Sequence, residues 1–406
     1  MKQAPHLFAA AISLVICGAI AAAFVFYAGY FEKKYVHAVA ALDHSAVNAG
    51  AELDKVALKQ NDLLLIYGAS ELMLLDTKYQ ANQLFSTYPT GFMVYNDTSK
   101  GGSGLTIAQK LASLGKDLQG KRLIIAVGPA IMTMAPLGEV NTRHYDGNFS
   151  ELHALELALS FDLSPETKEL AARRMLGFPE TLQDKPLLKF ILENLAQGGF
   201  INHILYYLSW PLGEIEVAIL HLEDHYATVN FIRHLSAQEV QVVHQPEQIQ
   251  WSTLLKAATR EQVHSTTSNH FGVDDSQWPK IKELFAKPVA PGSRDNDFIY
   301  DVDHAEEWDD LDIALHVAQE LGAQPIILSS PMNVPLWEKI GVSEFAQNEY
   351  YTKLRSVVAP YGFPIIDFQQ YDKEPYFSMD LASHVSRKGW IYVDQTLDEI
   401  FHGNLP

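Results

Sequence analysis

Cysteine and basic residues are both scarce in this sequence. One cysteine among 406 residues excludes an internal disulfide framework and cysteine-based zinc sites. Lysine and arginine number 30 against 49 aspartates and glutamates, which gives a formal net charge of −19. A sequence-independent nucleic-acid binder needs a basic face, so that class is excluded. Hydrophobic residues make up 48% of the chain, enough for a packed core, so global disorder is excluded too.

Near the amino terminus, one segment has no formally charged residue. Residues 7–31 form an apolar run of 25 residues, which is long enough to cross a hydrocarbon core of about 30 Å. A secretory signal has a shorter apolar region, about 7–15 residues, followed by small residues at a cleavage site. This run instead ends in aromatic residues such as Tyr30 and Phe31. We therefore expect an uncleaved transmembrane anchor over residues 1–34, with a cleaved signal as the alternative.

The remaining residues, 35–406, form the body of the protein, which we place outside the cell membrane with the amino terminus in the cytoplasm. Residues 1–34 carry a net charge of +2, so the body carries −21. A body this acidic would repel a polyphosphate acceptor, although salt screens such repulsion beyond about 8–10 Å. The charge leaves the acceptor open and suits a cationic donor or a neutral glycan.

Five short apolar runs in the body predict the strands of a parallel sheet. Helical patterns lie between them, an alternation typical of an α/β fold with helices on both faces of the sheet. Nearly 200 residues separate the third run from the fourth, and we interpret about 135–305 as a largely helical insertion into one domain. The runs are residues 62–67, 91–95, 122–127, 324–329 and 363–367.

Polar or glycine residues follow three of these runs, at the edge of the sheet where open α/β proteins bind ligands. Ser70 follows the first run, Gly102 lies in a glycine-rich loop after the second, and Asn333 follows the fourth. A serine hydroxyl becomes a nucleophile when a neighbouring base takes its proton. The alternative is that Ser70 only caps a helix, a role that serine fills well.

Asp380 and His384 lie near the carboxyl terminus, just before a helix expected to start around Ser386. A histidine that acts as a base needs its other ring nitrogen held by an acceptor, and a carboxylate supplies this. Their four-residue spacing lets both side chains face one site. Taken alone, the pair is better explained as a surface aspartate and a helix-capping histidine, because the chain has 16 histidines.

Taken together, these residues follow the chain order of SGNH-type hydrolases, and the chain resembles the DltD family of D-alanyl transfer proteins. The resemblance covers most of residues 1–400 and is weakest over 240–300. Besides the apolar amino terminus, it depends on four motifs: Gly68-Ala69-Ser70-Glu71-Leu72, Gly128-Pro129, Ser330-Pro331-Met332-Asn333 before Trp337, and Asp380 to His384 before Lys388-Gly389-Trp390.

The resemblance implies a three-layer α/β/α, flavodoxin-like parallel sheet of the SGNH-hydrolase type behind one transmembrane helix. It also implies D-alanine esterification of an envelope polymer, usually teichoic acid, with Ser70 as nucleophile, His384 as general acid and base, and Asp380 as its orienting partner. We expect the oxyanion to be held by the Ser70 N–H group together with either a Gly102 N–H group or the Asn333 side-chain amide. The implied partners are a membrane-bound O-acyltransferase, a D-alanyl carrier protein and the envelope polymer or glycan that accepts the acyl group.

Two departures from the family pattern leave alternatives open. Alanine stands at position 69, where serine is usual, and three residues rather than two separate Asp380 from His384. Asp372 and Asp394 are therefore alternative partners for the histidine. The alternative functions are a plain SGNH-type esterase or thioesterase, and a non-catalytic protein that presents a carrier or polymer to a membrane acyltransferase.

Two other segments, one rich in histidine and one rich in aromatic residues, contain side chains that could bind a metal or a partner. His221 and His225, with His234 beyond, could place metal ligands on one helix face, but they lack the His-Glu-x-x-His pattern, and we expect a solvated helix face instead. We predict neither a metal nor a cofactor. The aromatic segment 200–210 is expected to be core, or else a surface that docks a partner or the bilayer.

Overall fold

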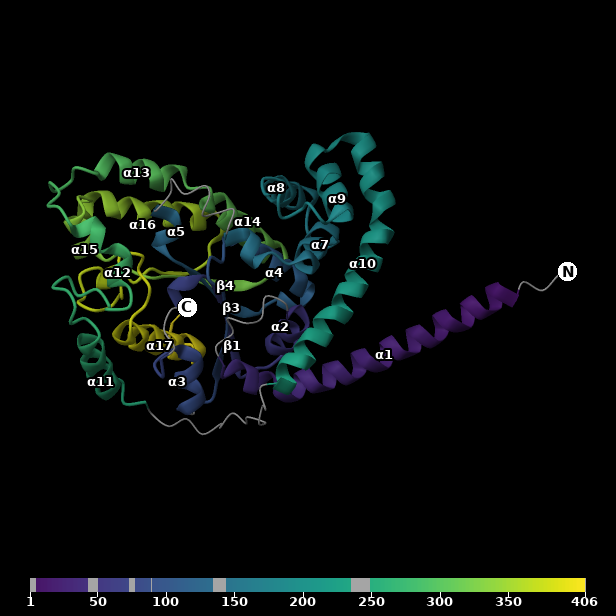
Figure 1. The fold of residues 1–406 in the computed structure, drawn as a ribbon, viewed down its shortest axis with the longest axis horizontal. Helices are drawn as coiled ribbons and strands as arrows, with labels where there is room; N and C mark the ends of the chain where they lie inside the picture. The colour runs from purple at the N-terminus through teal and green to yellow at the C-terminus, as the bar shows by residue number, and fades with distance from the viewer. Residues whose placement is uncertain are drawn as a thin grey trace.

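A parallel sheet of five strands forms the centre of the protein, as a computed structural model shows (Figure 1). The structure describes residues 5–42, 50–72, 77–88, 90–133, 144–234 and 249–405. The strand order is β2-β1-β3-β4-β5, the order of flavodoxin-like doubly wound sheets. The predicted parallel α/β architecture is therefore confirmed. The strands are β1 (Leu63–Gly68), β2 (Met93–Thr98), β3 (Arg122–Val127), β4 (Gln324–Ser329) and β5 (Ile365–Ile366).

The strand boundaries differ from the sequence prediction at two places. β2 continues to Thr98, past the end of the apolar run at residue 95, because its backbone pairs in register with β1 as far as Gly68 opposite Thr98. β5 is only two residues long and pairs with β4 through Ile365 and Ile366. Pairing with a neighbour, rather than hydrophobicity, thus sets where these strands end.

Alternate residues of each strand enter two separate hydrophobic clusters, one on each face of the sheet. Leu65, Ile125 and Ile327 belong to one cluster with side chains of α2, α4, α14 and α16. Ile66 and Ile124 belong to the other with side chains of α3, α11 and α17. Buried strands with apolar residues on both faces are what a sheet between two helical layers requires. The helices of these layers are α2 (Ala51–Leu58), α4 (Gly104–Leu114), α14 (Glu307–Glu320), α16 (Glu344–Val358), α3 (Ala81–Thr87), α11 (Trp251–His264) and α17 (Arg387–Phe401).

Serine residues cap the starts of helices α4 and α17. Ser103 and Thr106 form a reciprocal capping box at the start of α4, which satisfies two backbone donors that the helix leaves unpaired. Ser386 accepts hydrogen bonds from the N–H groups of Lys388 and Gly389 at the start of α17. The predicted helix start around Ser386 is confirmed.

Between β3 and β4 the chain is largely helical, as predicted for the insertion. Four of its helices, α7 to α10, pack on one another, and α7 packs on α4 of the main layer. Helices α11, α12 and α13 of this stretch lie on the side of the body away from α10 (Figure 1). The helices are α5 (Pro129–Thr133), α7 (Glu151–Leu159), α8 (Pro165–Leu176), α9 (Pro186–Gln197), α10 (Gly199–His234), α12 (Trp278–Ile281) and α13 (Asp295–His304); α15 (Val334–Lys339) follows β4.

Helix α1 (Pro5–Ala40) projects from the body and is longer than the predicted anchor (Figure 1). Its outer turns are exposed, with Phe8 at 73% and Phe26 at 82%, whereas Glu32 and Val36 in its last turns are buried. Among the described residues, it is the one helix long and apolar enough to cross a membrane, which fits an anchor or a signal sequence.

Candidate active site

The chain turns sharply after β1, and Ser70 lies in this turn, at the start of a 3₁₀ segment, Ser70–Leu72. Two glycines make room for the turn. A Cβ atom on Gly68 would lie 2.8 Å from the Cβ of Ala126, and one on Gly128 would lie 2.9 Å from a carboxyl oxygen of Glu71. Both contacts are closer than van der Waals packing allows, so larger residues there would displace the turn that carries Ser70.

A short hairpin-like loop brings His384 to this turn from the far end of the chain. Ser378 and Val385 form an antiparallel bridge, and the N–H group of Met379 donates to the carbonyl of His384 at 2.8 Å. The N–H group of Val385 then donates to the carbonyl of Glu71 at 3.0 Å, which ties the loop to the residue next to Ser70. Two segments more than 300 residues apart are thereby held side by side.

Ser70, His384 and Asp380 form a continuous hydrogen-bonded chain. Ser70 Oγ lies 3.1 Å from His384 Nε2, and His384 Nδ1 lies 2.7 Å from Asp380 Oδ2. The other carboxyl oxygen of Asp380 accepts the N–H groups of Ala382 at 3.0 Å and His384 at 3.3 Å. Asp380 is buried, while Ser70 and His384 are partly accessible. This is the geometry in which an imidazole can take a proton from a serine hydroxyl while a carboxylate fixes its tautomer.

Comparisons with known proteins assign the chain to a family. A family model described as "DltD protein" matches residues 43–402. The chain belongs to the DltD family. It is 26% identical to Protein DltD of Bacillus subtilis (strain 168) over 390 residues, covering 96% of this chain and 95% of that protein. It is 25% identical to Protein DltD of Staphylococcus aureus (strain NCTC 8325 / PS 47) over 414 residues, covering 99% and 97%. Protein DltD of Lacticaseibacillus rhamnosus is 23% identical over 350 residues, covering 86% and 79%.

The structure separates the three aspartates considered as partners of His384 in this DltD-family chain. Only Asp380 is hydrogen-bonded to the imidazole. Asp372 instead accepts the hydroxyl of Tyr351, and burial raises the pKa of its carboxyl to about 7. Asp394 lies fully buried on α17, where burial raises the pKa of its carboxyl well above the usual range. The extra residue between Asp380 and His384 is accommodated by Ser383, which is in the left-handed region with φ of 61°.

Gly102 and Asn333 lie where the sequence places them, at the carboxyl ends of β2 and β4. The N–H group of Gly102 donates to the carbonyl of Ser99 at 2.9 Å, so it closes a turn rather than pointing to the serine. Asn333 precedes α15, and its side chain does not cap that helix. Their role in binding an oxyanion stays a prediction.

Two buried carboxyl groups behind the serine were missed by sequence reasoning. Glu71 accepts the N–H group of Ala69 at 3.0 Å, and Glu307 accepts the N–H group of Gly104, at the start of α4, at 2.5 Å. Burial raises the pKa of both carboxyl groups, and for Glu307 the neighbouring Asp310 carboxylate raises it further. Both line a cavity of about 20 Å³ beneath the turn, room for about one water molecule. Both carboxyl groups therefore hold backbone N–H groups near the site, at Ala69 and at Gly104.

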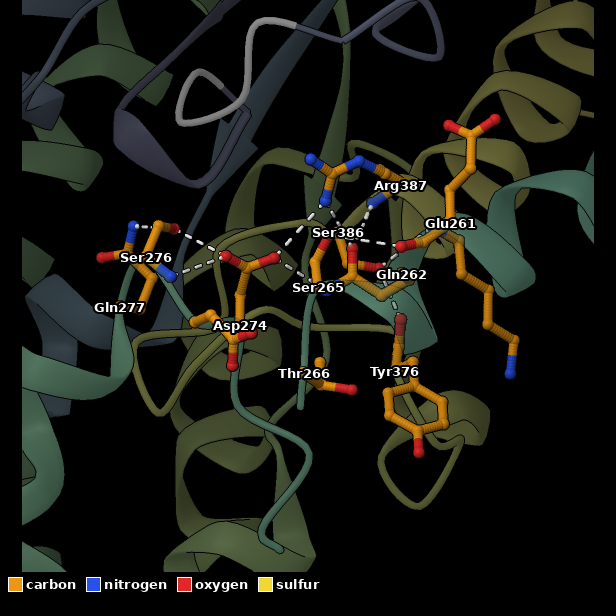
Figure 2. Close-up of polar contacts among 12 residues, drawn as sticks. Glu261, Gln262, Ser265, Thr266, Asp274, Ser276, Gln277, Tyr376, Ser386 and Arg387 are labelled. Carbon is orange, nitrogen blue, oxygen red and sulfur yellow. Dashed lines mark hydrogen bonds and ion pairs between the residues drawn. The ribbon is translucent and has the colours of Figure 1, made fainter. Parts of the chain in front are cut away.

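A polar cluster from the insertion holds the loop that carries Asp380 and His384 (Figure 2). Asp274 lies at its centre: its N–H group donates to the carbonyl of Met379 at 2.8 Å, and its carboxylate accepts from Arg387 at 3.4 Å and from Gln262 at 3.1 Å. The loop is therefore clasped just before Asp380 and just after His384. No sequence pattern pointed to Asp274, because it lies more than 100 residues upstream in a segment that looks irregular.

The histidines of α10 do not form a metal site. Among the described residues, no group of three or more histidine, cysteine, aspartate or glutamate side chains is arranged to hold a metal ion. The predicted solvated helix face is correct for His234, which is exposed, and wrong for His221 and His225. His225 is 5% exposed and pairs with Glu32 of α1 at 2.7 Å, and His221 lies 2.9 Å from both Glu52 and Glu156. These ion pairs join α10 to α1, α2 and α7.

Proposed function

We propose that this DltD-family chain is a membrane-anchored serine acyltransferase that transfers D-alanyl groups to an envelope polymer such as teichoic acid. The observation that carries the proposal is the hydrogen-bonded chain of Ser70, His384 and Asp380, with 3.1 Å and 2.7 Å between successive side chains. A non-catalytic protein would need no such alignment, because serine and histidine would serve only packing. The D-alanyl substrate is what resemblance to the family implies.

The proposed reaction has two symmetrical halves. His384 Nε2 takes the proton of Ser70 Oγ, which attacks the acyl carbon of an ester or thioester donor and expels the alcohol or thiol after His384 protonates it. A hydroxyl of the acceptor then gives its proton to His384 and attacks the acyl-serine, and His384 passes that proton to Ser70 Oγ as the ester bond to the serine breaks. The Ser70 N–H group and the Asn333 side-chain amide are the donors proposed for the tetrahedral oxyanion.

Anchoring by α1 is the second part of the proposal. A cleaved signal would leave the body without the last turns of α1, yet Ala28, Val36 and Val39 are fully buried in it. Glu32 is buried in its pair with His225, and cleavage on the carboxyl-terminal side of Glu32 would leave the imidazole without its carboxylate. The helix therefore belongs to the fold and to the membrane together, with the body outside the cytoplasm. The proposed partners are a membrane-bound O-acyltransferase, a D-alanyl carrier protein and the acceptor polymer.

The acidic body fits the donor better than the acceptor. A D-alanyl ester carries a free ammonium group, which a domain of net charge −21 attracts. A polyphosphate acceptor would be repelled at long range, although salt limits this to about 8–10 Å. A neutral glycan acceptor is the variant of the proposal that the charge favours.

The test is ester-linked D-alanine released from whole envelopes of a deletion strain, complemented with the wild type, Ser70→Ala or Ser330→Ala. Ser330 is a matched control, because it also follows a strand and its buried hydroxyl has no hydrogen-bond partner among the described residues. We expect wild type and Ser330→Ala to restore the ester and Ser70→Ala to fail. Full restoration by Ser70→Ala would exclude the covalent route. Free D-alanine without polymer ester would identify an esterase instead.

A further inference from the structure

Helix α10 exposes a continuous apolar stripe to the outside of the body. Six apolar side chains, with exposed fractions from 43% to 71%, make up this stripe, which we call the outer face of α10. They are Ile201, Ile204, Leu208, Leu212, Ile215 and Ile219. Steps of three or four residues place all six on one side of a helix. Soluble proteins rarely leave so long an apolar stripe in water, so the outer face needs an occupant.

The opposite face of α10 is fixed against the body, so the stripe cannot turn inward. Tyr206 donates its hydroxyl to the carbonyl of Ala158 at 2.9 Å. A Cβ atom on Gly213 would lie 2.7 Å from a methyl group of Leu159, so α10 lies close against α7 at this point. The fold thus holds the outer face outward.

The outer face has almost no polar companions. Between residues 200 and 220, His203 and Tyr207 are the exposed side chains with a polar atom, and the two charged ones, Glu214 and Glu216, are partly covered. Protein interfaces usually surround an apolar centre with a polar rim and hydrogen-bonding groups. An apolar stripe with aromatic neighbours and no rim of this kind is typical of contact with the bilayer interface.

The position of α10 beside α1 identifies the occupant. His225 of α10 is paired with Glu32 of α1 at 2.7 Å, and Arg233 donates to the hydroxyl of Tyr27 at 2.7 Å. In Figure 1, α10 forms the edge of the body on the side toward which α1 extends. A membrane crossed by α1 therefore faces the outer face of α10. We propose that this face lies in the interfacial region of the bilayer, an inference that rests on the proposed anchoring by α1.

The experiment uses the full chain in lipid vesicles and the fact that Cys17 is its only cysteine. In a Cys17→Ser background, Leu208→Cys and Leu212→Cys each receive a polarity-sensitive fluorophore. Tyr300→Cys is the exposed control, at 62% exposure on α13, on the opposite side of the body from α10 (Figure 1). Val15→Cys, in the exposed part of α1, reports anchoring by itself. Vesicles of phosphatidylcholine and phosphatidylglycerol carry a quencher on their acyl chains, and circular dichroism confirms folding of each labelled variant.

We expect the labels at 208 and 212 to be quenched at least about two-fold, as for side chains at the acyl boundary, and the label at 300 to be unaffected. If the label at 15 is quenched while those at 208 and 212 behave like the one at 300, the bilayer proposal is overturned and the anchoring stands. An unquenched label at 15 overturns both. Shielding of 208 and 212 in native membranes, but not in protein-free vesicles, would assign the face to a membrane protein and refute contact with lipid.

Discussion

Replacing Asp380 by asparagine should disable the serine while leaving the loop in place. In the structure, Asp380 Oδ1 accepts two backbone N–H groups, from Ala382 and His384, and Oδ2 faces His384 Nδ1 at 2.7 Å. An asparagine must keep its carbonyl oxygen on the backbone donors. Its amide nitrogen then faces Nδ1, which becomes an acceptor, so the ring proton moves to Nε2. With that proton in place, Nε2 cannot take the hydrogen of Ser70.

The size of the effect follows from the free energy needed to restore a working imidazole in the Asp380→Asn variant. Flipping the amide would leave two backbone donors facing an NH₂ group, at about 1–3 kcal/mol for each unsatisfied donor. Without the carboxylate, the imidazolium also loses a charge-assisted hydrogen bond worth about 1.5–3 kcal/mol. Together these amount to roughly 3.5–9 kcal/mol, so we expect a loss of at least several hundred-fold in rate.

Covalent labelling of Ser70 by a fluorophosphonate measures this rate in the purified full chain. Asp394→Asn is the matched control: its carboxyl is fully buried, and neither oxygen has a hydrogen-bond partner among the described residues. Burial raises the pKa of Asp394 well above its usual range, which favours the uncharged carboxyl, and we expect the isosteric amide to label within about two-fold of wild type. Labelling of Asp380→Asn within about three-fold of wild type would refute the assigned role.

Three further predictions concern the scaffold. Glu32→Ala should lower the free energy of unfolding by about 3–5 kcal/mol in denaturant titrations, because it leaves the buried His225 without its partner; a loss below about 1 kcal/mol would mean that the pair adds little. Two carboxylates raise the pKa of His221 to about 9, so the stability that this histidine adds to the fold is full below pH 6.5 and is lost as the pH rises to 9. The difference in melting temperature between wild type and His221→Gln should therefore shrink over that range. A constant difference would contradict this prediction. Gly104→Ala should lower the melting temperature by several degrees, because the new Cβ would overlap the backbone of α14. A Cβ on Gly147 meets nothing within 4 Å, so Gly147→Ala should change the melting temperature little. Equal effects of the two substitutions would refute the close contact between α4 and α14 at Gly104.

The sheet could be predicted from the sequence because its strands are short apolar runs, covered by helices on both faces of the sheet. The end of β2 could not, since Asn96, Asp97 and Thr98 look like a loop until β1 pairs with them. The serine and the histidine were found from their positions in the chain order. Asp380 was the expected partner of the histidine, with Asp372 and Asp394 as alternatives, and the geometry shows which carboxylate contacts the imidazole.

Contacts between distant segments were beyond the reach of sequence patterns. A histidine spacing on α10 suggested either metal ligands or a wet surface, and only the packing of α1 against α10 shows that His225 is buried with a carboxylate. The same holds for Asp274, which lies between β3 and β4 and stabilises the loop that carries Asp380 and His384. Local patterns report the face that a residue presents, but they carry no information about which element will cover it.

Helix α1 passes into the hydrophobic core without a break, and this limits where the serine can work. About 20 of its 36 residues suffice to cross a bilayer, and the last turns are packed inside the body instead of forming a flexible tether. With α1 as the proposed anchor, the body would not swing far above the membrane, and Ser70 would stay at a nearly constant height over the lipid head groups. Under the proposed acyl transfer, an acceptor polymer must be brought down to that height, so acylation should favour the segment of the polymer nearest the membrane.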